Sequence, residues 1–107
     1  MKTQVSQESD DAIFTLMLQN DEMDRIFWFQ DKSSGEVKFE AEGHHVGRDA
    51  IVKECTVMRD GVHIVLSSGE VVSFYFCDLS LREYLGVVSA LKKLYPSAQK
   101  ILEVFDA

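Results

Sequence analysis

The amino-acid sequence predicts an α+β fold: an antiparallel β-sheet meander of about six strands, packed by a C-terminal helix and a short final helix. Short apolar runs separated by turn-forming residues occupy residues 12–76, whereas residues 80–95 repeat their apolar side chains at helical spacing. The chain has 107 residues, of which 46% are hydrophobic. This length suits one domain over residues 1–107, with the polar residues 1–9 expected to be disordered.

The first half of the chain is expected to contain three strands. Residues 12–19 (AIFTLMLQ) are apolar at every second position, and residues 25–30 (RIFWFQ) are aromatic and β-branched. In residues 37–41, apolar side chains alternate with Lys38 and Glu40, which predicts a strand with one solvated face. An acidic turn at residues 20–24 and the DKSSG turn at residues 31–35 separate these strands. Residues 43–49 (GHHVGRD) are expected to form a loop.

The dipeptide Asp60-Gly61 predicts a hairpin between strands at residues 51–59 and 62–67. Both central residues of a type I′ turn need positive φ, which Asp and Gly tolerate better than most residues. A longer connection is expected at Ser67-Ser68-Gly69, because a two-residue turn there would place the apolar stripes of the two strands on opposite faces.

A three-residue loop with Gly69 in a left-handed conformation brings the two stripes to one face. In this register Ile64 pairs with Val72 and Val62 pairs with Phe74. A second set of side chains then points away from the helix: Met58, His63, Val65, Val71, Ser73 and Tyr75. We expect the first strands to cover this set, and the alternative is that it forms an exposed binding patch.

The segment Ser80-Leu81-Arg82-Glu83 matches a capping box, which predicts that a helix begins there. Six apolar side chains are expected to face the sheet: Leu81, Tyr84, Leu85, Val88, Leu91 and Leu94. Pro96 then interrupts the pattern, and a last short helix is expected to contain Ile101, Leu102 and Phe105.

Negative charge is concentrated in the first half of the chain. Residues 1–54 hold 12 acidic and 6 basic side chains, residues 55–107 hold 6 and 5, and the net charge is −7. This balance disfavours nucleic acid and anionic membranes as direct partners, because both require clusters of Lys and Arg. The complementary partner is a basic protein. Because the sequence has neither a leader-like segment after Lys2 nor an apolar run of roughly 20 residues, we expect a cytoplasmic protein.

The side chains expected to bind this partner combine acidic groups with one aromatic anchor: Asp21, Glu22, Asp24, Glu40, Glu42, His44 and Trp28. A core position for Trp28 is the favoured alternative. No catalytic, cofactor or metal site is expected, because the sequence lacks the ligand spacing of a zinc site and any Gly-rich phosphate loop. Cys55 and Cys77 are expected to be reduced thiols on strands separated by a third strand.

Two other functional classes remain open. His44-His45 beside Asp49 would suit a small hydrolase or ligand-binding domain, although solvated loop histidines are the favoured interpretation. An acidic secretion chaperone or adaptor would be a dimer that uses the patch around Met58 and Tyr75. For the inhibitor that we favour, a monomer is expected rather than a dimer.

The segment IVKECTVMRDGVHIVLSSGEVVSFYF, followed by LREYLGVVSALKKLY, resembles the closing part of small immunity proteins from bacterial polymorphic toxin and contact-dependent growth inhibition systems. The resemblance covers residues 51–95 and consists of the strand and helix pattern with an acidic balance. It implies a non-enzymatic, cytosolic inhibitor that binds one cognate toxin domain, often a nuclease with a basic groove, and blocks its active site. It assigns no individual binding residue.

Overall fold

The computed structural model describes residues 2–7, 12–20, 24–42, 51–76 and 79–105. These residues form two four-stranded sheets. Sheet A has the order β1-β2-β3-β4 and consists of β1 (Lys2–Ser6), β2 (Ala12–Gln19), β3 (Arg25–Asp31) and β4 (Val37–Ala41). Sheet B has the order β7-β6-β5-β8 and consists of β5 (Val52–Met58), β6 (Gly61–Leu66), β7 (Val71–Tyr75) and β8 (Leu102–Val104). The helices are α1 (Leu81–Leu94) and the 3-10 helix η1 (Ser97–Gln99).

The α+β class and the antiparallel pairing of consecutive strands are confirmed, but the predicted single meander is divided into two sheets. The predicted final helix is wrong. After η1 the chain forms β8, which pairs in parallel with β5 and aligns Cys55 with Leu102 and Val57 with Val104. Backbone hydrogen bonds hold this segment as a strand beside β5: Cys55 N donates to Ile101 O at 2.9 Å and Phe105 N donates to Val57 O at 2.9 Å.

The expectation of disorder over residues 1–9 is wrong for Lys2–Ser6, which forms β1 at the edge of sheet A. Its polar sequence concealed the strand because an edge strand with little burial does not need an apolar stripe. Val5 pairs with Leu16, and the Val5 side chain remains 50% exposed.

The predicted hairpin between β5 and β6 is confirmed, but its turn differs from the expectation. Met58 pairs with Gly61, so the turn residues are Arg59 and Asp60, and neither has positive φ. The turn is therefore not type I′. Gly61 lies within β6, where a Cβ atom would approach the carbonyl oxygen of Phe74 to 2.8 Å. Close strand packing, rather than positive φ, is the reason for glycine at this position.

The predicted register between β6 and β7 is confirmed. Ile64 pairs with Val72 and Val62 pairs with Phe74, while Gly69 adopts a φ of 94° in the connecting loop. Leu66 N donates to Glu70 O at 2.8 Å, which closes the three-residue loop at residues 67–69.

Helix α1 begins at the predicted capping box. Ser80 Oγ accepts a hydrogen bond from Glu83 N at 3.1 Å and lies 2.9 Å from the Glu83 carboxylate. The predicted buried face was partly wrong, because Leu81 and Leu85 are 61% and 56% exposed. The helix is rotated relative to the expected stripe and buries Tyr84, Val87, Val88, Ala90, Leu91 and Leu94.

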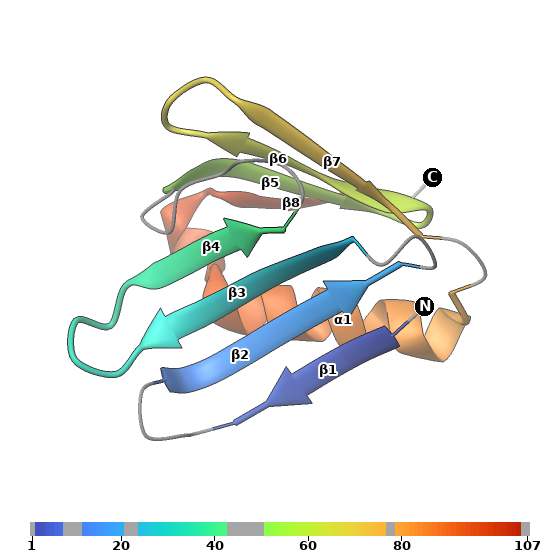
Figure 1. Ribbon diagram of the computed structural model, residues 1–107, viewed down its shortest axis with the longest axis horizontal. Coiled ribbons are helices and arrows are strands. Elements are labelled where there is room, and N and C mark those ends of the chain that lie inside the picture. Colours follow the sequence, from blue (N-terminus) through green and yellow to red (C-terminus); the bar gives the residue numbers. More distant parts are fainter. Residues whose placement is uncertain (1, 8–11, 21–23, 43–50, 77–78, 106–107) are drawn as a thin grey trace.

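The core lies between the inner faces of the two sheets and α1. In Figure 1, α1 runs behind sheet A, and it contacts β1, β2, β3 and β8. One apolar cluster joins all three layers, with Trp28 and Phe39 from sheet A, Ile64 and Phe74 from sheet B, and Leu91 from α1. None of the helices in the described ranges is both long and apolar enough to cross a membrane.

Candidate functional site

The structure describes four of the seven predicted partner-binding residues, which are Asp24, Trp28, Glu40 and Glu42. Asp21, Glu22 and His44 lie outside the described residues, as do His45, Asp49 and Cys77. Asp24 lies just before β3, where its backbone N–H donates to Asn20 Oδ1 at 3.0 Å. Glu40 lies on β4 and Glu42 directly follows it.

Charge is balanced over the part of the chain that the structure describes. Those residues hold ten acidic and ten basic side chains, and the remaining residues hold eight acidic side chains and one basic one, Arg48. The whole excess of −7 therefore belongs to the segments outside the described ranges. The expectation that the strand face around Glu40 and Glu42 is an acidic surface is not supported, because Glu42 pairs with Arg25, and Glu40 shares the outer face of β4 with Lys38, which pairs with Asp31.

Glu42 forms an ion pair within the chain. Arg25 Nε donates to Glu42 Oε2 at 2.8 Å and Arg25 Nη2 donates to Glu42 Oε1 at 3.0 Å. The guanidinium carbon also lies 5.5 Å from the centre of the Phe27 ring. Two parallel hydrogen bonds hold the planar guanidinium beside the aromatic ring. Glu42 therefore positions a cation on the solvated face of sheet A.

Trp28 is a core residue and not a surface anchor. Its side chain has no exposed area, and its ring lies 5.3 Å from that of Phe39 at an angle of 50°. The prediction that Trp28 contacts a partner is therefore wrong, and the alternative of a core position is confirmed. Strand alternation is the cause, because Ile26 and Trp28 share the inner face of β3.

The same alternation turns Phe27 and Phe29 outward. On the outer face of sheet A, Phe27 pairs with Met17 of β2 and with Glu40 of β4. Phe29 pairs with Lys38, and all three apolar side chains remain partly exposed. We call Met17, Phe27 and Phe29 the sheet A strip. It lies on the face opposite α1.

The sheet A strip borders a hollow of about 450 Å³. Besides the strip, the hollow is lined by Gln4, Ala12, Thr15, Leu16, Arg25, Trp28 and Glu40. Aromatic side chains, Met and Arg, which all line this hollow, are residue types enriched where proteins bind each other. The sequence contained the signal for this strip, because RIFWFQ places aromatic side chains on both faces of one strand.

The outer face of sheet B is also exposed, so the expectation that the first strands cover it is wrong. Val71 and Tyr75 on β7 are 62% and 58% exposed. The predicted position of His63 is confirmed, since its Nδ1 lies 2.7 Å from Ser73 Oγ and its ring packs edge-on against Tyr75 at 5.8 Å. The first strands form sheet A and leave this face open.

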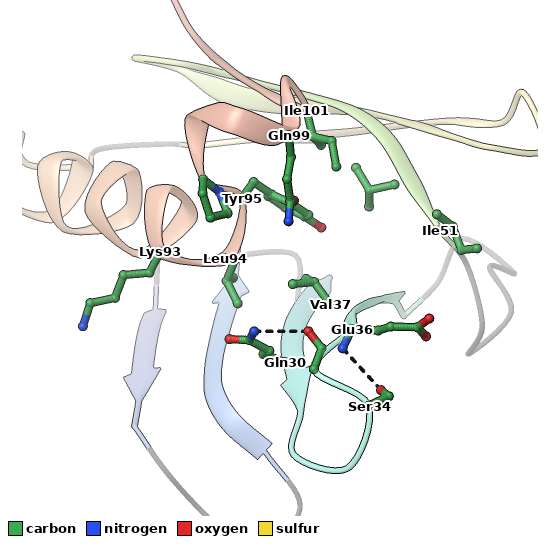
Figure 2. A pocket seen from close by; sticks show the side chains of 13 residues that line it. Gln30, Ser34, Glu36, Val37, Ile51, Lys93, Leu94, Tyr95, Gln99 and Ile101 are labelled. Atoms are coloured by element: carbon green, nitrogen blue, oxygen red, sulfur yellow. Dashed lines mark hydrogen bonds between the residues drawn. The ribbon is translucent and has the colours of Figure 1, made fainter.

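A cleft of about 380 Å³ lies where the turn before β4, the start of β5 and the end of α1 meet (Figure 2). Gln30 Nε2 donates to Gly35 O at 3.1 Å on one wall. Figure 2 shows the carboxylate of Glu36 and the ammonium of Lys93 pointing away from each other on opposite sides. Lys93 instead packs on the Phe14 ring, with its nitrogen 5.2 Å from the ring centre.

The cleft therefore has amides and apolar side chains along its described walls rather than a paired acid and base. The hydrolase alternative requires His44 or His45, which lie outside the described residues, although the residue that follows that segment, Ile51, lines the cleft. Within the described ranges, no group of three His, Cys, Asp or Glu side chains is placed to hold a metal ion.

Two buried groups near the cleft lack acid–base activity at neutral pH. Burial raises the pKa of the Cys55 thiol to about 12, so the thiol stays protonated and acts as a small core side chain. Burial is also the main reason why the pKa of Tyr95 is raised; Cys55 adds a smaller rise, and the Trp28 side chain opposes it. The Tyr95 hydroxyl and Trp28 Nε1 are buried and form no hydrogen bond with any described residue.

Comparison of the chain with protein-family models, with curated proteins and with solved structures gives no match.

Proposed function

We propose that this protein is a non-enzymatic inhibitor that binds a basic protein domain and blocks its active site, as the immunity proteins that it resembles do. The observation that carries the proposal is the sheet A strip, Met17, Phe27 and Phe29, on the solvated face of an antiparallel sheet. A face of this kind normally carries polar side chains. Aromatic residues and Met are the types enriched where proteins bind each other.

The acidic residues in two connections of sheet A support a basic partner. The connection between β1 and β2 contains Glu8, Asp10 and Asp11, the connection between β2 and β3 contains Asp21 and Glu22, and neither connection contains Lys or Arg. Both connections belong to sheet A, the sheet that carries the strip. We expect these carboxylates to speed the encounter with a cationic surface, whereas burial of the strip slows dissociation. A nuclease domain with a basic substrate groove fits both requirements.

The test uses the protein encoded by the neighbouring gene as the probe. Its association and dissociation rates with this chain are measured by surface plasmon resonance at several salt concentrations. We expect association to slow as salt rises, and to slow further when Asp21, Glu22 and Asp24 are changed together to Lys. Phe29→Ser should instead raise the dissociation rate, because it removes apolar contact area.

A matched control changes Glu54, Glu70 and Glu103 together to Lys. These residues are exposed on sheet B and its loop, and the change in net charge equals that of the Asp21, Glu22 and Asp24 variant. This variant should slow association much less than the Asp21, Glu22 and Asp24 variant. A complex that is insensitive to salt, or a Phe29→Ser variant that dissociates as slowly as the natural chain, would contradict the proposal. Absence of any complex would contradict it as well.

A further inference from the structure

The edges of the two sheets differ in charge. In the part of the chain that the structure describes, β1 and β4 border sheet A, and β7 and β8 border sheet B. Three of these edges carry charged side chains: Lys2 on β1, Lys38 and Glu40 on β4, and Glu103 on β8. Charged residues on an edge strand oppose pairing with another chain. The sequence of β7, VVSFY, contains neither charge nor proline.

Among the described residues, no strand pairs with the outer edge of β7. Toward β6, Phe76 N donates to Asp60 O and Leu66 N donates to Glu70 O, each at 2.8 Å. Because these groups alternate along an antiparallel strand, the N–H and C=O groups of Val71, Ser73 and Tyr75 point away from β6. Val71 and Tyr75 also expose most of their side chains.

We propose that β7 pairs with β7 of a second copy of this chain, in an antiparallel arrangement centred on Ser73. This register places Val71 opposite Tyr75 of the second copy and uses every outward backbone group of the strand. The pairing is closed by a two-fold axis, so it produces a dimer and not a filament. Sheet B of each copy becomes half of one continuous sheet.

A second copy of β7 brings an equally uncharged strand to this edge, whereas a charged segment would place its charge against the edge. Each chain has a net charge of −7, so two copies repel each other at a distance. An edge without charged side chains lets them approach without bringing like charges together, and among the described edge strands β7 is the one of this kind. The opposed Val71 and Tyr75 side chains form an aromatic–β-branched cross-strand pair, which stabilises antiparallel sheets.

The dimer is expected to be weak. Stable protein–protein interfaces bury about 800 Å² on each partner, and a strand of five residues buries less. We therefore expect a dissociation constant in the micromolar range and a dimer fraction that depends on protein concentration. Added salt should strengthen the dimer by screening the repulsion between copies. This salt effect is opposite in sign to that expected for the complex with a basic partner.

The test is sedimentation equilibrium of the purified chain without any partner, from about 5 µM to about 500 µM, at low and high salt. The expected result is a shift from monomer toward dimer as concentration and salt rise. Val71→Lys should return the chain to monomer by placing cations at the paired edges. Ser73→Pro should do the same, because proline removes the central N–H group while remaining tolerated on an edge strand.

The matched control is Val5→Lys, which makes the same change at a half-exposed valine of β1. It should dimerise as the natural chain does, and circular dichroism should show the same fold in all variants. A natural chain that stays monomeric at the highest concentration and salt overturns the proposal. A dimer that Val5→Lys dissociates, or that Val71→Lys and Ser73→Pro leave intact, overturns it too. A dimer would replace the monomer expected from the sequence, whereas the inhibitor function is tested separately by the salt-dependent complex with a basic partner.

Discussion

Arg25 and Glu42 form a two-hydrogen-bond ion pair beside the Phe27 ring, at the border of the sheet A strip. The pair ties the start of β3 to the end of β4, where Glu42 N also donates to Arg25 O at 2.9 Å. Glu42 was expected to contact a basic partner directly. Its position shows a further contribution, because the carboxylate neutralises and orients a cation next to the apolar surface, and the direct contact stays a prediction.

The coupling between Arg25 and Glu42 should be small and sensitive to salt. The two side chains are 42% and 50% exposed, so a double-mutant cycle with Arg25→Gln and Glu42→Gln should give about 0.5–1 kcal/mol at low ionic strength. Urea unfolding at low and high salt measures this coupling. Glu36→Gln changes an exposed carboxylate in the turn before β4 and should leave stability within about 0.5 kcal/mol. A coupling that does not decrease at high salt would contradict this account.

Replacing two glycines by alanine should change stability in opposite directions. Gly61→Ala places a Cβ atom 2.8 Å from the backbone oxygen of Phe74, so it should destabilise the fold by about 1–3 kcal/mol. Gly86→Ala meets no atom within 4 Å on the exposed face of α1, and it should stabilise by about 1 kcal/mol through helix propensity. Thermal unfolding of both variants is the measurement. Equal effects would show that close packing is not the reason for Gly61.

Asp31 should make the protein more stable above its unfolded-state pKa than in strong acid. Its carboxylate accepts hydrogen bonds from the Ser33 hydroxyl at 2.7 Å and from Ser33 N at 2.8 Å, and these bonds are the main reason why its pKa falls from 3.8 to about 2. A lowered folded-state pKa means that the stabilisation is complete above pH 3.8 and is lost as pH falls toward about 2.

The pKa of Asp31 can be read from NMR titration of its carboxyl carbon. Ser33→Ala removes the hydroxyl donor and should raise this pKa toward the ordinary value. Ser68→Ala, in the other Ser-Ser-Gly turn, should leave it unchanged. If the Asp31 titration midpoint stays at about 2 in Ser33→Ala, the side-chain hydrogen bond is not its main cause.

The sequence predicted the fold well for strands that have one buried and one solvated face. Alternation gave the bounds of β2 and the register of β6 with β7, because a slip of one residue would expose the whole apolar stripe. The alternation pattern failed for strands that bury little of their surface or that pair with a strand far away in the sequence. Lys2–Ser6 is a polar edge strand, and β8 pairs with β5 from far along the chain, so neither has a local pattern that identifies it.

The candidate site was predicted less well because the acidic residues were counted without regard to the basic residues that form ion pairs with them. Glu42 forms an ion pair, and the excess charge belongs to connecting segments rather than to the strand faces. Trp28 was considered as the aromatic anchor, whereas its neighbours Phe27 and Phe29 face outward. Which face of β3 is buried depends on its partners β2 and β4 and on α1, and an aromatic run alone does not determine it.

Tyr95→Phe should stabilise this protein, although it removes a polar group from a well-packed position. The Tyr95 side chain is 3% exposed, and its hydroxyl has no hydrogen-bond partner among the described residues. An unpaired buried hydroxyl has lost its hydration without compensation, so its removal should raise the free energy of unfolding by about 1 kcal/mol. Tyr75→Phe, at an exposed hydroxyl, should change it by less than about 0.5 kcal/mol. Urea unfolding distinguishes the two variants. If Tyr95→Phe lowers stability instead, the hydroxyl is paired in solution, and the Trp28 N–H, which also acts on the Tyr95 pKa, is the partner.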